Sequence, residues 1–456
     1  MDLIVKRGRI VTQDGLIYTD IGIRDGKIIA IGNDLGQART TIDAGEALIF
    51  PGLIDPHVHF HLPVGDTFSS DDFLTGSRAA LFGGVTTFLD FTNQKPGTPL
   101  YSTWENRISE ISGNTYADFG LHAVVNSWSN SYQEEIEKLL TNGVNSFKFF
   151  MCGKGSGERH DDGLLHRLMQ GLHDKGILIL HAESGALLDQ FTEDQVDSGH
   201  LDASAHLEAR PVIVEEEAVD RAIFFARKTG TLTMILHLSS GDAALQVKKA
   251  RAEGVPVMAE TCPQYLLLDD SIYKGLNAYL FATCPPVRKR RDQEILWEQL
   301  ALGNLQVVSS DHCPFWRRDK DKWGKDFRKL YFGLPGVETI LPILYTFGVD
   351  KGLLSLQDLV RLTSSNAARI YGLSRNKGWI QVGFDADLVL FDPEESWQLR
   401  QTGLHMACDF NPYEGLRMKG RVKKVIRAGR LVVSDESFLE LSQDGRFQFR
   451  GKPEFI

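Results

Sequence analysis

The sequence predicts an α/β fold, in which an (α/β)8 TIM-type barrel carries a small β-sandwich formed from both chain termini. Two observations support this prediction. Between about residues 50 and 370, apolar strand-like runs alternate with amphipathic helical stretches, as they do in parallel βα units. The two ends of the chain instead carry short alternating apolar runs broken by glycine, a pattern typical of antiparallel strands.

Eight apolar runs are the candidate barrel strands. They cover residues 48–54, 86–91, 119–125, 146–151, 177–181, 233–237, 257–260 and 306–310. Each is followed by a loop and a helical stretch, and eight such units fit a closed barrel better than an open sheet.

The terminal β runs are shorter. At the start of the chain, Asp25-Gly26 separates two apolar runs as a hairpin turn would. Near the end, β-like runs return at 379–383, 386–391, 422–426 and 431–433. We therefore expect residues 1–50 and 374–440 to form the β-sandwich domain and 51–373 the barrel. Residues 441–456 would form a tail available for subunit contacts.

Composition narrows the function. The 456 residues carry a formal charge of −10, which argues against nucleic-acid and anionic-membrane partners, since both need a basic face. No apolar run approaches the roughly 18 residues of a membrane span, and the first residues do not resemble a signal peptide. The five cysteines are scattered singly, as reduced thiols are. We expect a cytoplasmic enzyme.

Histidines and one carboxylate end several of the apolar runs. His57 and His59 are two residues apart after the first run, so their side chains face the same side. His181, His237 and Asp311 end three later runs. Active sites of barrels lie at the carboxyl ends of the strands, and a ring of imidazole and carboxylate groups there suits zinc or a similar ion.

Lys148 stands inside the apolar run 146–151. An unpaired ammonium group is costly there unless the side chain reaches the rim or loses its proton. A neutral lysine could instead add carbon dioxide and form a carbamate that bridges two metal ions. With two ions roughly 3.5–4 Å apart, a bridging water becomes hydroxide near neutral pH. Asp311 would accept its proton and pass it to the leaving nitrogen.

The motifs that contain these residues resemble those of the cyclic amidohydrolases, in the amidohydrolase superfamily. They are PGLIDPHVH at 51–59, GGVTT at 83–87, FK at 147–148, HAE at 181–183, HLS at 237–239, ETCPQYL at 260–266, PPVR at 285–288, SDHCPF at 310–315, ADLV at 386–389 and NPYEG at 411–415. The resemblance extends over most of the chain and is greatest to the hydantoinase/dihydropyrimidinase branch.

This resemblance implies hydrolytic opening of a hydantoin or dihydropyrimidine ring, with two divalent ions as cofactors, Zn²⁺ before other ions. It assigns His57, His59, Lys148 and Asp311 to one ion, and Lys148, His181 and His237 to the other. Lys148 would be N6-carboxylysine and Asp311 the catalytic acid and base. The partners implied are a small cyclic ureide or amide and further copies of the chain, as a homotetramer or homodimer.

Several positions depart from the family pattern and define candidate substrate-binding residues. Gly153 replaces a tyrosine of D-selective hydantoinases, Cys284 replaces a serine, and Phe332 replaces an asparagine before Gly333. His61 stands where dihydroorotases carry a carboxylate-binding arginine, whereas Asn93 keeps a residue that some of them use. Because allantoinases resemble this chain in lacking the tyrosine that Gly153 replaces, allantoinase is the first alternative. A dihydroorotase and a non-catalytic scaffold homologue are further alternatives, although the scaffold relatives have lost ligands that this chain retains.

Overall fold

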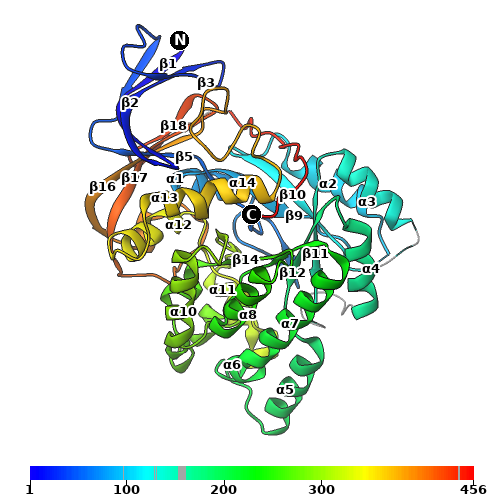
Figure 1. Ribbon diagram of the computed structural model, residues 1–456. Helices are drawn as coiled ribbons and strands as arrows, with labels where there is room; N and C mark the ends of the chain where they lie inside the picture. The colour runs from blue at the N-terminus through cyan, green and yellow to red at the C-terminus, as the bar shows by residue number, and fades with distance from the viewer. Residues whose placement is uncertain (96, 128, 130, 153–160, 440–441) are drawn as a thin grey trace.

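The computed structural model describes residues 1–95, 97–127, 129, 131–152, 161–439 and 442–456 of the chain. A barrel of parallel strands surrounded by helices lies beside a sheet that contains strands from both ends of the chain (Figure 1). In the described part, no helix combines the length and the apolar character needed to cross a bilayer.

Eight parallel strands form the barrel. They are β6 (Leu53–Asp55), β9 (Val85–Phe91), β10 (Asp118–Val124), β11 (Ser146–Phe150), β12 (Ile177–His181), β13 (Leu232–Ile235), β14 (Val257–Thr261) and β15 (Val307–Val308). They are hydrogen-bonded in chain order from β6 to β15. A parallel bridge between Val58 and His312 brings the first and last strands together, and His59 N donates to His312 O at 2.8 Å. The predicted (α/β)8 barrel is confirmed.

Helices follow the barrel strands and cover the outside of the barrel. They are α1 (Phe73–Phe82), α2 (Leu100–Ile111), α3 (Tyr132–Thr141), α4 (Asp162–Leu172), α5 (Gly185–Asp197), α6 (Ala205–Ala209), α7 (Val212–Thr229), α8 (Gly241–Ala252), α9 (Pro263–Leu267), α10 (Arg290–Ala301), α11 (Arg317–Lys320), α12 (Ile340–Leu344), α13 (Leu356–Val360) and α14 (Asn366–Ile370). Two π-helical segments, η5 (Tyr345–Val349) and η6 (Arg361–Ser365), continue α12 and join α13 to α14.

Nine strands from the two ends of the chain form a second sheet. They are β1 (Leu3–Thr12), β2 (Gly15–Arg24), β3 (Lys27–Gly32), β4 (Thr40–Asp43), β5 (Leu48–Pro51), β16 (Leu388–Gln398), β17 (Arg417–Arg427), β18 (Arg430–Ser434) and β19 (Ser437–Phe438). Both termini thus build one β unit, as predicted, and its strands are hydrogen-bonded as a single sheet. The Asp25-Gly26 turn joins β2 to β3 with positive φ at both residues, 49° and 74°.

Two strand predictions were wrong. The run 48–54 is not one barrel strand, because the chain leaves the terminal sheet at Gly52, where Gly52 N donates to Asp387 O at 2.8 Å. β5 pairs with β16, whereas β6 pairs with β9. The run 379–383 is irregular chain that ends in a turn, and it is held to β3 by the hydrogen bond from Gly383 N to Ile28 O at 2.7 Å.

The register of the strands places Lys148 inside the barrel. Its partners across β10 and β12 are Val124 and Ile179, and the series continues to Met234 and Met258. Residues paired in register point to the same side of a sheet. These four apolar residues belong to a buried cluster with members from seven of the barrel strands, which only the barrel interior can bring together. Lys148 therefore shares an interior layer with large apolar side chains and is 1% exposed.

The described part of the C-terminal tail, residues 442–456, packs against the barrel. Phe119 N donates to Arg446 O at 3.0 Å, and Gln448 N donates to Phe119 O at 2.7 Å. Arg450 is buried and donates to Ser146 Oγ at 2.7 Å and to Leu121 O. The tail is thus attached to the amino-terminal halves of β10 and β11, away from the carboxyl ends of these strands.

Gly52 provides a test of the junction between the two sheets. A Cβ atom there would overlap Thr86 Oγ1 and would lie 2.8 Å from Asp387 Cβ. We expect Gly52→Ala to lower the free energy of unfolding by about 1–3 kcal/mol, as overpacking does, measured by urea denaturation. The matched control is Gly275→Ala, because a Cβ atom at Gly275 meets open space. Equal stability of the two variants would contradict the close packing at this junction.

Candidate functional site

Three ligand-type atoms form a small triangle at the carboxyl end of the barrel. His57 Nε2 and His59 Nε2 are 3.2 Å apart. Asp311 Oδ1 lies 3.2 Å from His57 Nε2 and 3.4 Å from His59 Nε2. Nitrogen and oxygen ligands that share one tetrahedral zinc ion at 2.0–2.2 Å lie roughly 3.3–3.6 Å from one another. The triangle is close to the spacing that a metal ion requires.

A buried carboxylate supports the first histidine. Glu260 Oε1 lies 2.6 Å from His57 Nδ1, and both side chains are 0–1% exposed. A carboxylate on the far ring nitrogen fixes the orientation of a metal-binding histidine and leaves its other nitrogen for the ion. Burial raises the pKa of Glu260 to about 8. Burial also holds the pKa of His57 well below its usual range, which keeps this imidazole in the neutral form that binds metals.

Lys148 lies next to this triangle among aromatic rings. Its Nζ atom is 5.4 Å from the ring centre of Phe91 and 4.7 Å from that of Phe150. The Phe91 ring also stacks on His59 at 4.7 Å. Burial lowers the pKa of Lys148 to about 8, although Asp311 and Glu260 act in the opposite direction. The neutral amine, which is the form that can add carbon dioxide, is therefore accessible under mildly alkaline conditions.

The second pair of histidines faces the first. The ring centres of His181 and His237 are 4.6 Å apart, and His237 lies 5.5 Å from His57. His237 Nδ1 is buried without a hydrogen-bond partner in the described part of the chain. Buried polar atoms without a partner are rare, and a bound ion would satisfy this one.

Two of these strand-end residues have an unusual backbone. His237 has φ of 37° and Asp311 has φ of 49°, in the left-handed region that non-glycine residues avoid. Such strain persists where surrounding contacts hold it, and it concentrates at functional sites. Burial would raise the pKa of Asp311, but His57 and His59 outweigh burial and lower it, so this carboxylate is ionised.

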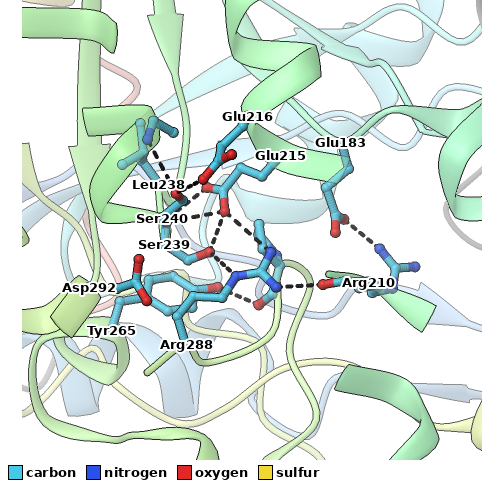
Figure 2. A network of polar contacts seen from close by, with 12 residues as sticks. Glu183, Arg210, Glu215, Glu216, Leu238, Ser239, Ser240, Tyr265, Arg288 and Asp292 are labelled. Atoms are coloured by element: carbon cyan, nitrogen blue, oxygen red, sulfur yellow. Dashed lines mark hydrogen bonds and ion pairs between the residues drawn. The ribbon is translucent and has the colours of Figure 1, made fainter. Parts of the chain in front are cut away.

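A buried ion pair lies behind His181. Glu183 Oε2 is 2.7 Å from His181 Nε2 and accepts a hydrogen bond from Arg210 Nη1. Figure 2 shows the Glu183 carboxylate directed toward the Arg210 guanidinium. Burial opposes ionisation of Glu183, but Arg210 and His181 outweigh it and hold its pKa far below the usual range. Contacts with Cys152 and Glu183 likewise overcome burial and raise the pKa of His181 to about 9.

The structure therefore brings together all six residues that the sequence predicted as metal ligands. They come from β6, β11, β12, β13 and β15 or from the residues that directly follow these strands. The orphaned His237 nitrogen, the triangle of ligand atoms and the mixture of imidazole and carboxylate donors all fit divalent ions such as zinc.

Three of the candidate substrate-binding residues lie on neighbouring loops. The ring of Phe332 stacks on His206, with centres 4.9 Å apart, and lies 5.4 Å from the Arg210 guanidinium. Gly333 has φ of 137°, and its N–H donates to Ala282 O at 2.9 Å, which joins this loop to the segment that carries Cys284. Cys284 is half-buried.

The three remaining candidate substrate-binding residues do not lie on the loops that carry Phe332, Gly333 and Cys284. His61 is exposed, and its ring stacks on Phe68 in the hairpin of β7 (Pro63–Val64) and β8 (Thr67–Phe68), with centres 4.4 Å apart. Asn93 is half-buried and follows β9. Gly153 lies outside the described residues.

Sequence reasoning gave no role to Glu260, Glu183 or Arg210. Glu260 carried a usable signal, because it ends an apolar run in the same way as the candidate ligands do. Glu183 follows His181 at the spacing of two that places side chains on one face. Arg210 precedes α7 and carries no periodic signal, so only the folded chain reveals it.

Comparisons with known proteins agree with this arrangement. The model of the amidohydrolase family matches residues 186–432. The D-hydantoinase of Rhizobium radiobacter is 38% identical over 455 residues, which cover 99% of each chain. The D-hydantoinase of Geobacillus stearothermophilus is 37% identical over 458 residues, covering 99% of this chain and 97% of its own. The crystal structure of dihydropyrimidinase from Brevibacillus agri matches with a TM-score of 0.97 at 35% identity and covers 100% of both chains. On this evidence, the chain belongs to the amidohydrolase family, in its hydantoinase/dihydropyrimidinase branch.

Proposed function

We propose that this chain is a metal-dependent hydrolase that opens the ring of a cyclic amide or ureide of the hydantoin or dihydropyrimidine class. The observation that carries the proposal is the triangle of His57 Nε2, His59 Nε2 and Asp311 Oδ1, with sides of 3.2–3.4 Å, beside the buried Lys148. The names of the relatives, D-hydantoinase and dihydropyrimidinase, supply the substrate class. They favour this class over allantoin, our first alternative.

The six residues would hold two divalent ions, with zinc the ion that the donor set suits best. His57, His59, Lys148 and Asp311 would hold one, and Lys148, His181 and His237 the other. A carbamate on Lys148, giving N6-carboxylysine, would let one side chain contribute to both. When bound, such a pair of ions supplies Lewis-acid polarisation of a carbonyl and a water acidic enough to ionise near neutral pH.

Asp311 would carry the proton. Its carboxylate is ionised in the free protein, so it can accept the proton of the attacking water. The same group would then donate this proton to the ring nitrogen as the C–N bond breaks.

The loops above the barrel would hold the substrate. Phe332, Gly333 and Cys284 lie on neighbouring segments on the side of Arg210, and we assign them, with Gly153, to contacts with the ring. His61 and Asn93 would contact the substrate from the side of the first two barrel strands, β6 and β9. We further propose a cytoplasmic homotetramer or homodimer that engages neither nucleic acid nor membrane.

Turnover of a substrate panel tests the proposed reaction. Purified protein loaded with zinc should hydrolyse hydantoin, phenylhydantoin or dihydrouracil. The reaction is monitored by the loss of the ring absorbance, and the product is identified by mass spectrometry. Allantoin should be a poor substrate. If no five- or six-membered ureide is opened, the substrate class is wrong. If in addition the protein retains less than one ion per chain, the alternative of a non-catalytic scaffold is favoured.

Lys148→Ala tests the carbamate. The variant should bind metal more than about 100-fold more weakly, since it loses the group assigned to both ions, and should lose activity together with metal. Short carboxylic acids, which can occupy the vacated space, should restore part of both. Lys175→Ala is the matched control, because Lys175 is half-exposed and paired with Glu137. Normal metal content in Lys148→Ala, measured by elemental analysis, would exclude the assignment of Lys148.

A further inference from the structure

We propose that Arg288 is a positioning residue that holds His181 and His237 in fixed relation to each other through one buried network. This inference rests on the proposed function, in which these two histidines share the second ion. The network joins the loops after β12 and β13 to the segment that precedes α10 (Figure 2).

One branch of the network begins at His181. Its Nε2 atom is 2.7 Å from Glu183 Oε2, and the same oxygen accepts a hydrogen bond from Arg210 Nη1. Glu183 is 0% exposed. The orientation of the His181 ring therefore depends on where Arg210 holds the Glu183 carboxylate.

The other branch begins two residues after His237. Ser239 N donates to Glu215 Oε1 at 2.7 Å, and Ser239 Oγ and Ser240 N both donate to Glu215 Oε2, the latter at 3.1 Å. Glu215 belongs to the first turn of α7 and is 1% exposed. Three donors from one short loop thus converge on one buried carboxylate, which holds the chain where His237 has its strained φ of 37°.

Arg288 joins the two branches. Its Nη1 atom donates to the carbonyl of Arg210, Nε donates to Ser239 Oγ at 3.1 Å, and Nη2 lies 3.3 Å from Glu215 Oε2. Figure 2 shows the guanidinium between these groups. A planar guanidinium can make these separate contacts at fixed angles, whereas a lysine ammonium presents a single charged point.

The network contains two buried ion pairs. Glu183 and Glu215 are two buried carboxylates, and Arg210 and Arg288 are the two guanidiniums that contact them. Loss of Arg288 would leave Glu215 buried without its counter-ion, which is the costly way to break a buried pair. The loop after His237 would then relax, and the relation between the two rings would no longer be fixed.

The first ion should be affected much less. Three of its residues, His57, His59 and Asp311, follow the ends of β6 and β15, and its fourth, Lys148, lies on β11. Glu260 rather than the Arg288 network supports His57. The inference thus predicts a selective effect on one of two ions. A general loss of folding would weaken both.

Metal titration of the metal-free protein tests the inference. Zn²⁺ binding is followed by calorimetry with a competing chelator, and Co²⁺ binding by its visible absorption, which reports the geometry around the ion. Wild type should bind two ions. In Arg288→Gln one of the two ions, the one assigned to His181 and His237, should lose about 10–100-fold in affinity, the usual effect of removing such supporting contacts, while the affinity of the other ion stays within about threefold.

Two further variants separate the explanations. Arg288→Lys keeps the charge beside Glu215 and so protects folding, but it cannot make the three contacts, and it should also weaken one ion selectively. Arg291→Gln is the matched control: Arg291 is exposed and makes two hydrogen bonds of 2.8 Å to Asp242, so its loss should change neither ion.

The outcomes distinguish this inference from the proposed function. If wild type binds two ions and Arg288→Lys binds both with wild-type affinity, Arg288 is not a positioning residue and the proposed function stands. Equal weakening of both ions in Arg288→Lys also overturns the inference. If wild type itself does not bind two ions, the proposed two-ion site is wrong, whatever the variants show.

Discussion

In-register pairing between the parallel barrel strands holds Lys148 inside the barrel, and the candidate site depends on this. Val124, Lys148, Ile179, Met234 and Met258 are successive partners across five strands, so they form one interior layer. The next layer lies two residues further along each strand and contains His181 and Glu260. A slip of one residue in β11 would turn Lys148 outward and bring Phe147 or Phe149 inward. The apolar partners of Lys148 oppose such a slip, because it would break the packing of the layer on either side.

The same packing favours the uncharged forms of the ionisable groups that it buries. Burial lowers the pKa of Lys148 to about 8 and raises that of Glu260 to about 8, and it holds His57 and His237 neutral. Each of these shifts brings the group toward its uncharged form, as expected in a low-dielectric interior. Bound metal ions would reverse this preference for the carboxyl group, because cations stabilise carboxylates, and would agree with it for the histidines, which bind metals as neutral imidazoles. The barrel interior is thus better suited to the metal-loaded state than to permanent charges without ions.

Much of this arrangement could be predicted from the sequence, because it follows from periodicity. Apolar runs that end in His57, His181, His237 and Asp311 identify both the strands and the edge at which they meet. Lys148 is conspicuous for the same reason, as a charge within an apolar run. The break at Gly52 could not be predicted, since β5 and β6 read as one apolar run and only pairing with β16 separates them. The contacts of Arg210, Glu215 and Arg288 join segments distant in sequence, and no local pattern encodes such contacts.

The site therefore has two parts with different structural origins. The predicted ligands lie on barrel strands or follow their ends, whereas Cys284, Phe332 and Gly333 lie on loops outside these strands. The Arg288 network connects the two parts: Cys284 is four residues before Arg288 on the same segment, and Arg210 contacts both Glu183 and the Phe332 ring. Under the proposed function, a substitution near Cys284 or Phe332 would alter the orientation of His181 through these contacts without contacting it. Differences in substrate choice would then arise from small changes at the metal ions as well as from changes in the loops that hold the substrate.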